Sequence, residues 1–152
     1  MLGLAPGSYH GRDQQAELRQ LLGDSVDLQR RLLLPGVSGS MAGWYERATV
    51  FVLPSRFEGF PNVLLEAMAA GCACIASDCL TGPSDLIRHG ENGLLLSAQA
   101  ATRDWVDAID GLLHDPDRCH QLGARAAAVR ERYASERLRR DFLEAMSSFR
   151  HG

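Results

Sequence analysis

Short apolar segments alternate along this chain with longer segments whose apolar residues recur at helical spacing. Expected strands, each bounded at its end by Gly, Pro, Ser or Asp, are residues 2–5, 31–34, 49–53, 72–77 and 93–96. Expected helices between them are residues 12–23, 39–48, 62–70 and 82–89. Because strands separated by helices pair in parallel and are covered on both faces, the predicted fold class is α/β. In such folds the ligand binds at the carboxyl ends of the strands.

Beyond Ser97 the pattern becomes wholly helical and predicts helices packed on one side of the sheet. This region contains Asp115-Pro116-Asp117, a D-x-D spacing that some sugar-transferring enzymes use to hold a divalent metal. Asp115 directly precedes a proline at an expected first helical position, so helix N-capping explains it better than metal binding. We therefore expect no metal site.

Composition limits the classes of protein to which this chain can belong. The 152 residues predict a single domain of a soluble globular protein, with 45% hydrophobic and 23% charged residues. A net charge of -3 without a basic stripe argues against a nucleic-acid-binding surface. No charged and apolar leader opens the chain, and its longest apolar run, residues 67–76, is too short to span a bilayer. We expect a cytoplasmic protein.

The four cysteines are expected to be reduced thiols in the core. Cys72 and Cys74 form a C-x-C pair on a predicted strand, where the geometry rarely suits a disulfide. A metal site would need further Cys or His ligands nearby.

The stretch SRFEGFPNVLLEAMAAG places Glu58 in a glycine-flanked turn and Glu66 inside the helix that follows. Pro61 suits the first position of this helix, since its fixed φ fits there and its missing N–H would be unpaired anyway. The first amides, those of Asn62, Val63 and Leu64, are then expected to point unpaired into the turn with the positive end of the helix dipole. This combination predicts an anion site, most simply for phosphate.

The same helix separates buried from ligand-facing residues. Its spacing predicts that an arc facing the sheet is buried, made of Val63, Leu64, Ala67, Met68 and Gly71. Glu66 falls on another arc and can face the turn, where a carboxylate matches two adjacent ribose hydroxyls. Phosphate beside ribose describes a nucleotide, and Glu58 would then lie near the part of the ligand beyond the phosphate. The alternative for Glu66 alone is an exposed helix glutamate.

The segment SRFEGFPNVLLEAMAAGCACIASDCLTGPSDLIRHGENGLLL resembles the donor-binding segment of retaining glycosyltransferases of the GT-B fold. It is similar to the family 4-like, or group 1, glycosyl transferases, which include sucrose synthases and bacterial lipopolysaccharide and capsule enzymes. The E-x7-E pair, the aromatic-Glu-Gly-Phe-Pro turn, the Glu-Ala-Met-Ala-x-Gly helix end and the Glu-Asn-Gly-Leu-Leu turn occur in the family's order. The resemblance implies a Rossmann-like half of a GT-B fold followed by C-terminal helices.

The resemblance also implies roles for individual residues. Glu66 would bind the ribose hydroxyls of a nucleotide-sugar, and the amides of Asn62 and Val63 would meet its diphosphate. Gly36 and Val37, in a segment similar to the strand that ends beside the nucleobase, would lie near the base.

The sugar pocket is implied in the same way. Glu58 would lie against the transferred sugar as the candidate catalytic residue, and Gly59, Phe60 and Pro61 would shape that pocket. The expected reaction is retaining transfer of a hexose-type sugar from a UDP- or GDP-sugar to a glycan or lipid-linked acceptor in polysaccharide biosynthesis. No metal or other cofactor is implied, because helix dipole, amides and basic side chains stabilise the departing diphosphate.

Departures from the family pattern qualify this expectation. The family's Arg and Lys clamp on the diphosphate has no counterpart, since all 16 basic residues here are arginine. We expect residues 1–152 to be one truncated donor-binding domain without the acceptor-binding N-terminal domain, through which the enzyme would reach the inner face of the membrane. Alternatives are a nucleotide-binding subunit or scaffold that needs a separate partner half, and a nucleotide-sugar epimerase of related build.

Overall fold

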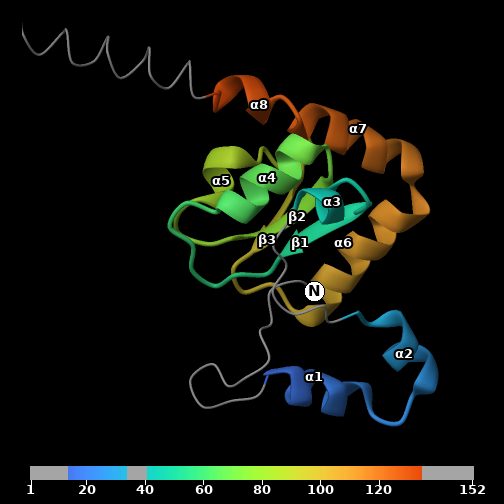
Figure 1. Ribbon diagram of the computed structural model, residues 1–152. Helices are drawn as coiled ribbons and strands as arrows, with labels where there is room; N and C mark the ends of the chain where they lie inside the picture. The colour runs from blue at the N-terminus through green and yellow to red at the C-terminus, as the bar shows by residue number, and fades with distance from the viewer. Residues whose placement is uncertain (1–13, 34–40, 135–152) are drawn as a thin grey trace, which may run out of the picture. The chain divides into compact units, whose positions relative to one another are not determined.

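We describe residues 14–33 and 41–134 of a computed structural model (Figure 1). The chain divides into two compact units, residues 1–41 and 42–152. Among the described residues, no helix is both long and apolar enough to cross a membrane.

The first unit contains helices α1, Gln14–Leu22, and α2, Val26–Arg31. Ser25 caps α2, and its hydroxyl accepts a hydrogen bond from the Leu28 amide at 3.5 Å. Arg31, predicted to open a strand, instead lies in the last turn of α2, where it pairs with Asp27 at 3.1 Å. The cap and this charge pair, one turn apart, outweigh the strand pattern. The predicted strand at residues 2–5 lies outside the described residues.

The second unit contains a parallel sheet, as predicted. Its strands are β1, Val50–Leu53, β2, Ala73–Asp78, and β3, Leu94–Ser97, in the order β1-β2-β3. Because all described strands are parallel, their carboxyl ends meet at one edge of the sheet. The turn after β1 and the loop after β2 therefore emerge side by side.

Helices surround this sheet, which confirms the predicted α/β class (Figure 1). They are α3, Ala42–Tyr45; α4, Asn62–Ala70; α5, Pro83–Leu86; α6, Thr102–His114; α7, Pro116–Ala126; and α8, Val129–Arg132. The predicted helix at 62–70 has the bounds of α4, since Pro61 precedes it and Gly71, at φ 88°, ends it in the left-handed region.

Helix α5 is shorter than the predicted 82–89 because a side chain ends it. The Asn92 amide group donates to the Leu86 carbonyl at 3.1 Å, and its oxygen accepts from the Arg88 amide at 2.7 Å. These bonds satisfy backbone groups that a longer helix would have used.

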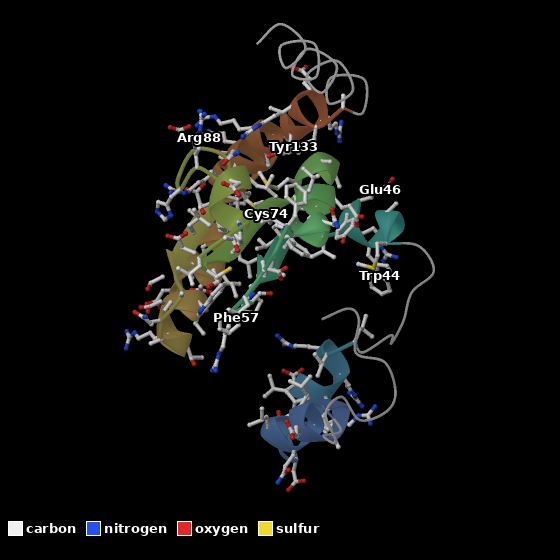
Figure 2. All side chains as sticks on the ribbon, turned by 90° about the vertical axis from the view of Figure 1, so that its left-hand side faces the viewer. Trp44, Glu46, Phe57, Cys74, Arg88 and Tyr133 are labelled. Carbon is white, nitrogen blue, oxygen red and sulfur yellow. The ribbon has the colours of Figure 1, made fainter. Side chains whose placement is uncertain are left out.

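The core lies on both faces of the sheet. On one face α6 and α7 bury Leu112, Cys119 and Leu122 against alternate residues of the strands, among them Ile75. Strand residues that alternate with these, such as Cys74, point to the other face of the sheet, which α4 covers. Figure 2 shows Cys74 enclosed between the elements. Right-handed β1-α4-β2 and β2-α5-β3 crossovers place α4 and α5 on the same face.

The four cysteines are free and buried, as predicted. Burial is the largest cause that raises the pKa of the Cys72, Cys74 and Cys119 thiols, so each stays protonated. Two thiols hold the segment before β1, because Cys72 Sγ donates to the Tyr45 carbonyl at 3.2 Å and Cys119 Sγ to the Thr49 carbonyl at 3.5 Å.

Candidate functional site

A turn of residues 54–61 joins the carboxyl end of β1 to α4 and carries the predicted sugar-pocket residues. The loop after β2 packs against it. Thr81 Oγ1 donates a hydrogen bond to the Glu58 carbonyl at 2.6 Å. Gly82 has φ 97°, and a Cβ there would lie 2.7 Å from the Gly59 oxygen and 2.8 Å from Pro61 Cδ. The backbone of this turn is therefore fixed by the neighbouring loop rather than by the turn alone.

Side chains of the turn differ in exposure. Glu58 is half-buried, Pro61 is buried, and Phe60 is 47% exposed. The Phe60 ring packs against Tyr133, which follows α8, with ring centroids 5.8 Å apart. Phe57 is 83% exposed and lies at the surface in Figure 2.

The start of α4 is less open than predicted. The Asn62 amide donates to the Phe60 carbonyl and the Leu64 amide to the Pro61 carbonyl, both at 3.0 Å. The prediction of three unpaired amides was wrong for these two, because Pro61 supplies an acceptor to the first turn and the chain doubles back at Phe60. No acceptor among the described residues pairs with the Val63 amide, and no side chain caps the helix. One backbone donor at this helix start therefore remains available.

The buried arc of α4 is nearly as predicted. Leu64, Ala67 and Met68 are fully buried. Val63 was predicted to be buried with them, but it is 42% exposed. Gly71 is exposed as well.

Glu66 is an exposed residue of α4 whose carboxylate contacts α3. The Tyr45 hydroxyl donates a hydrogen bond to Glu66 Oε2 at 3.2 Å. Burial, then the charge of Glu66, then this hydrogen bond raise the pKa of Tyr45 from 10.0 to about 12, so the phenol stays neutral. Sequence reasoning did not single out Tyr45, because no local spacing relates residues 21 positions apart.

Other predicted features fall elsewhere. Gly36 and Val37 lie outside the described residues. Asp115 caps α7, accepting from the Arg118 amide at 2.9 Å, as predicted. In the described parts of the chain, no group of three or more His, Cys, Asp or Glu side chains could hold a metal ion.

A cavity of about 440 Å³ lies away from this turn, between the end of α5 and helices α7 and α8. Leu86 and Val129 are buried beneath it, and Arg88, Arg125 and Arg132 are exposed around it. None of the predicted site residues lines it. The candidate site is therefore the open turn between β1 and α4, with Glu66 and Tyr45 beside it.

Comparison with known proteins decides the family. Residues 7–115 match the family model described as glycosyl transferases group 1. The chain belongs to this family. It is 38% identical over 119 residues to a D-inositol 3-phosphate glycosyltransferase of Pseudarthrobacter chlorophenolicus, covering 78% of this chain and 28% of that protein.

Solved structures share the fold of this chain. The C-terminal domain of a group 1 family protein from Francisella tularensis superposes with a TM-score of 0.72 at 25% identity, over 83% of this chain and 65% of that one. TarM of S. aureus, solved with fondaparinux, alpha-GlcNAc-glycerol and UDP, gives a TM-score of 0.77 at 25% identity, over 88% of this chain and 27% of that one. The chain is therefore of the C-terminal donor-domain type of a GT-B glycosyltransferase. Its match to three curated relatives covers 78% to 84% of this chain. The same match covers only 13% to 36% of the relatives' own length.

Proposed function

We propose that this chain binds a nucleoside diphosphate sugar, a UDP- or GDP-sugar, for retaining transfer of a hexose-type sugar to a glycan or lipid-linked acceptor. The observation that carries the proposal is the arrangement around the first turn of α4. Glu58 precedes that turn and Glu66 follows it, and the unpaired Val63 amide lies between them in the chain. A ribose at Glu66, a diphosphate at Val63 and a sugar at Glu58 follow in the order of a nucleotide-sugar.

Charge supports this assignment of roles. The start of α4 carries the positive end of a nine-residue helix dipole, with no acidic residue in its first turn. An uncapped helix start stabilises negative charge that accumulates on a departing diphosphate. We propose that transfer needs no metal, and that basic side chains from elsewhere in the whole enzyme complete the diphosphate site. A UDP complex of the structurally similar TarM supports a nucleotide at this fold.

Exposed apolar side chains support a partner over the same edge of the sheet. Phe57 is 83% and Leu80 94% exposed, and their segments touch through the bond between Thr81 and Glu58. Large exposed apolar side chains on two contacting segments are consistent with an interaction site there. We propose that an acceptor-binding half covers this edge and that the chain alone does not transfer sugar. A nucleotide-binding subunit without catalysis is the alternative.

Calorimetric titration with UDP, GDP and ADP tests nucleotide binding. We expect weak binding, lowered about tenfold or more by Glu66→Ala, because a hydrogen bond to a charged group contributes about 1.5–3 kcal/mol. The matched control is Asp110→Ala, which removes an exposed carboxylate from α6 on the other face of the sheet. Binding that Glu66→Ala leaves unchanged would contradict the ribose assignment.

Activity assays separate the remaining claims. Sugar transfer by the chain alone would overturn the requirement for an acceptor-binding half. A two-domain form that is inactive with every nucleotide-sugar would favour the binding subunit. For an active form, the anomeric configuration of the product, read by NMR, tests retention, and activity in EDTA tests metal independence.

A further inference from the structure

Tyr45 combines a buried ring with a hydroxyl that reaches an exposed carboxylate. Its side chain is 4% exposed, yet its hydroxyl donates to Glu66 Oε2 at 3.2 Å. A buried tyrosine usually directs its hydroxyl to a structural acceptor. Here the acceptor is the exposed carboxylate to which we assign the ribose.

We propose that Tyr45 is a positioning residue that orients the Glu66 carboxylate for the two ribose hydroxyls. This inference rests on the proposed function, since it assumes that Glu66 binds ribose. Tyr45 touches neither the sugar nor the diphosphate in this proposal. It acts through Glu66.

The tyrosine is anchored well enough to act in this way. Its ring meets Phe51 of β1 edge-on, with centroids 5.8 Å apart and planes at 74°. Its carbonyl accepts a hydrogen bond from the Cys72 thiol at 3.2 Å, just before β2. Contacts to β1 and to the residue before β2 hold Tyr45 in place, whereas the exposed Glu66 side chain has several rotatable bonds of its own. Glu46, the next residue, projects from the end of α3 (Figure 2) and is exposed.

The hydrogen-bonding capacity of the carboxylate fits both partners. An ionised carboxylate offers about four lone-pair sites on two oxygens. Tyr45 occupies one of them on Oε2, and the others stay available for the 2′ and 3′ hydroxyls. Because the phenol donates to Oε2, it holds the Glu66 side chain turned toward α3. The remaining sites then have a fixed direction, which favours a ligand with adjacent hydroxyls over one without them.

The test compares UDP with 2′,3′-dideoxy-UDP by calorimetry on the full chain. Tyr45→Phe keeps the ring and its contact with Phe51 and removes the hydroxyl. We expect it to weaken UDP binding roughly 3- to 10-fold, as the loss of one hydrogen bond implies, and to leave the dideoxy ligand nearly unchanged. In a Glu66→Ala background, Tyr45→Phe should have no further effect on UDP. Circular dichroism and unfolding of each variant exclude misfolding as the cause.

Each other outcome has a definite meaning. Equal weakening of UDP and dideoxy-UDP would overturn the positioning role and indicate a structural one. An effect of Tyr45→Phe that persists in the Glu66→Ala background would overturn the route through Glu66. If Glu66→Ala weakens UDP binding but Tyr45→Phe does not, this inference fails and the proposed function stands. If the unaltered chain binds no nucleoside diphosphate, both fail.

Discussion

The α position of Gly82 lies against the carbonyl oxygen of Gly59, so closely that a Cβ on Gly82 would be 2.7 Å from that oxygen. The two glycines belong to different loops at the carboxyl edge of the sheet. Their contact fixes the position of the turn that carries Glu58 relative to the loop after β2. Thr81 of that loop adds a hydrogen bond to the Glu58 carbonyl. The turn assigned to the sugar is therefore held by two loops together.

Gly82→Ala should disturb this turn. Gly82 has φ 97°, so any Cβ adds backbone strain as well as the clash with Gly59. We expect a loss of about 1–3 kcal/mol in the free energy of unfolding, measured in urea, together with weaker nucleotide-sugar binding. Gly90→Ala is the matched control, because Gly90 has φ 78° with nothing within 4 Å of a Cβ. Equal losses for both variants would mean that the contact with Gly59 contributes nothing.

Thr81→Val should separate the hydrogen bond from the packing. Valine has nearly the shape of threonine and cannot donate to the Glu58 carbonyl, so we expect a loss of about 1 kcal/mol in unfolding free energy. Sugar transfer by the whole enzyme should fall more than nucleotide binding, since Glu58 is assigned to the sugar and Glu66 to the ribose. Thr102→Val, at an exposed position of α6, is the control. A uniform fall in the affinities for UDP and for the UDP-sugar would contradict the separate roles of the two glutamates.

Gly123→Ala should destabilise the second unit strongly. A Cβ on Gly123 of α7 would lie 2.2 Å from the Gly71 oxygen, where the backbone at the end of α4 passes α7. Helix propensity alone would favour alanine by about 1 kcal/mol, so a loss of stability must come from this contact. Gly111→Ala, in α6 with nothing within 4 Å of a Cβ, should stabilise by about that amount. Urea unfolding of both variants checks the opposite signs.

Residues that start or end helices explain which parts of the fold were predicted well from the sequence. Pro61 and Gly71 bound α4, so its ends follow from residue type alone. Asp115 before Pro116 likewise identified the start of α7. Residue type was also sufficient to place Glu58 in a turn and Glu66 on a helix.

Side-chain hydrogen bonds, one ion pair and one tertiary contact explain what sequence reasoning missed. Asn92 ends α5 through Leu86, and the Ser25 cap with the Asp27 and Arg31 pair keeps Arg31 in a helix where a strand was predicted to begin. The bond from Tyr45 to Glu66 joins two helices through tertiary packing that no local pattern encodes. This last contact depends on the assembled fold.

Tyr45 should also make stability sensitive to alkaline pH. Its pKa is 10.0 in the unfolded chain and about 12 in the folded protein, through burial, the charge of Glu66 and their hydrogen bond. Between these values the unfolded state loses the phenol proton while the folded state keeps it. The unfolded state is then favoured, so the free energy of unfolding falls as pH rises from about 10 to 12, by up to about 1.4 kcal/mol per pH unit.

Tyr45→Phe removes the titrating phenol. Comparing the unaltered chain with this variant therefore isolates the contribution of Tyr45 to the fall in unfolding free energy. Buried thiols with a raised pKa add a loss of the same sign from about pH 9 upward, but they are common to both proteins. No lysine titrates in this range, because all 16 basic residues are arginine. Urea unfolding at intervals from pH 8 to pH 11.5 should give a steeper decline for the unaltered chain above about pH 10. Parallel declines would show that the phenol is not held neutral by burial and Glu66.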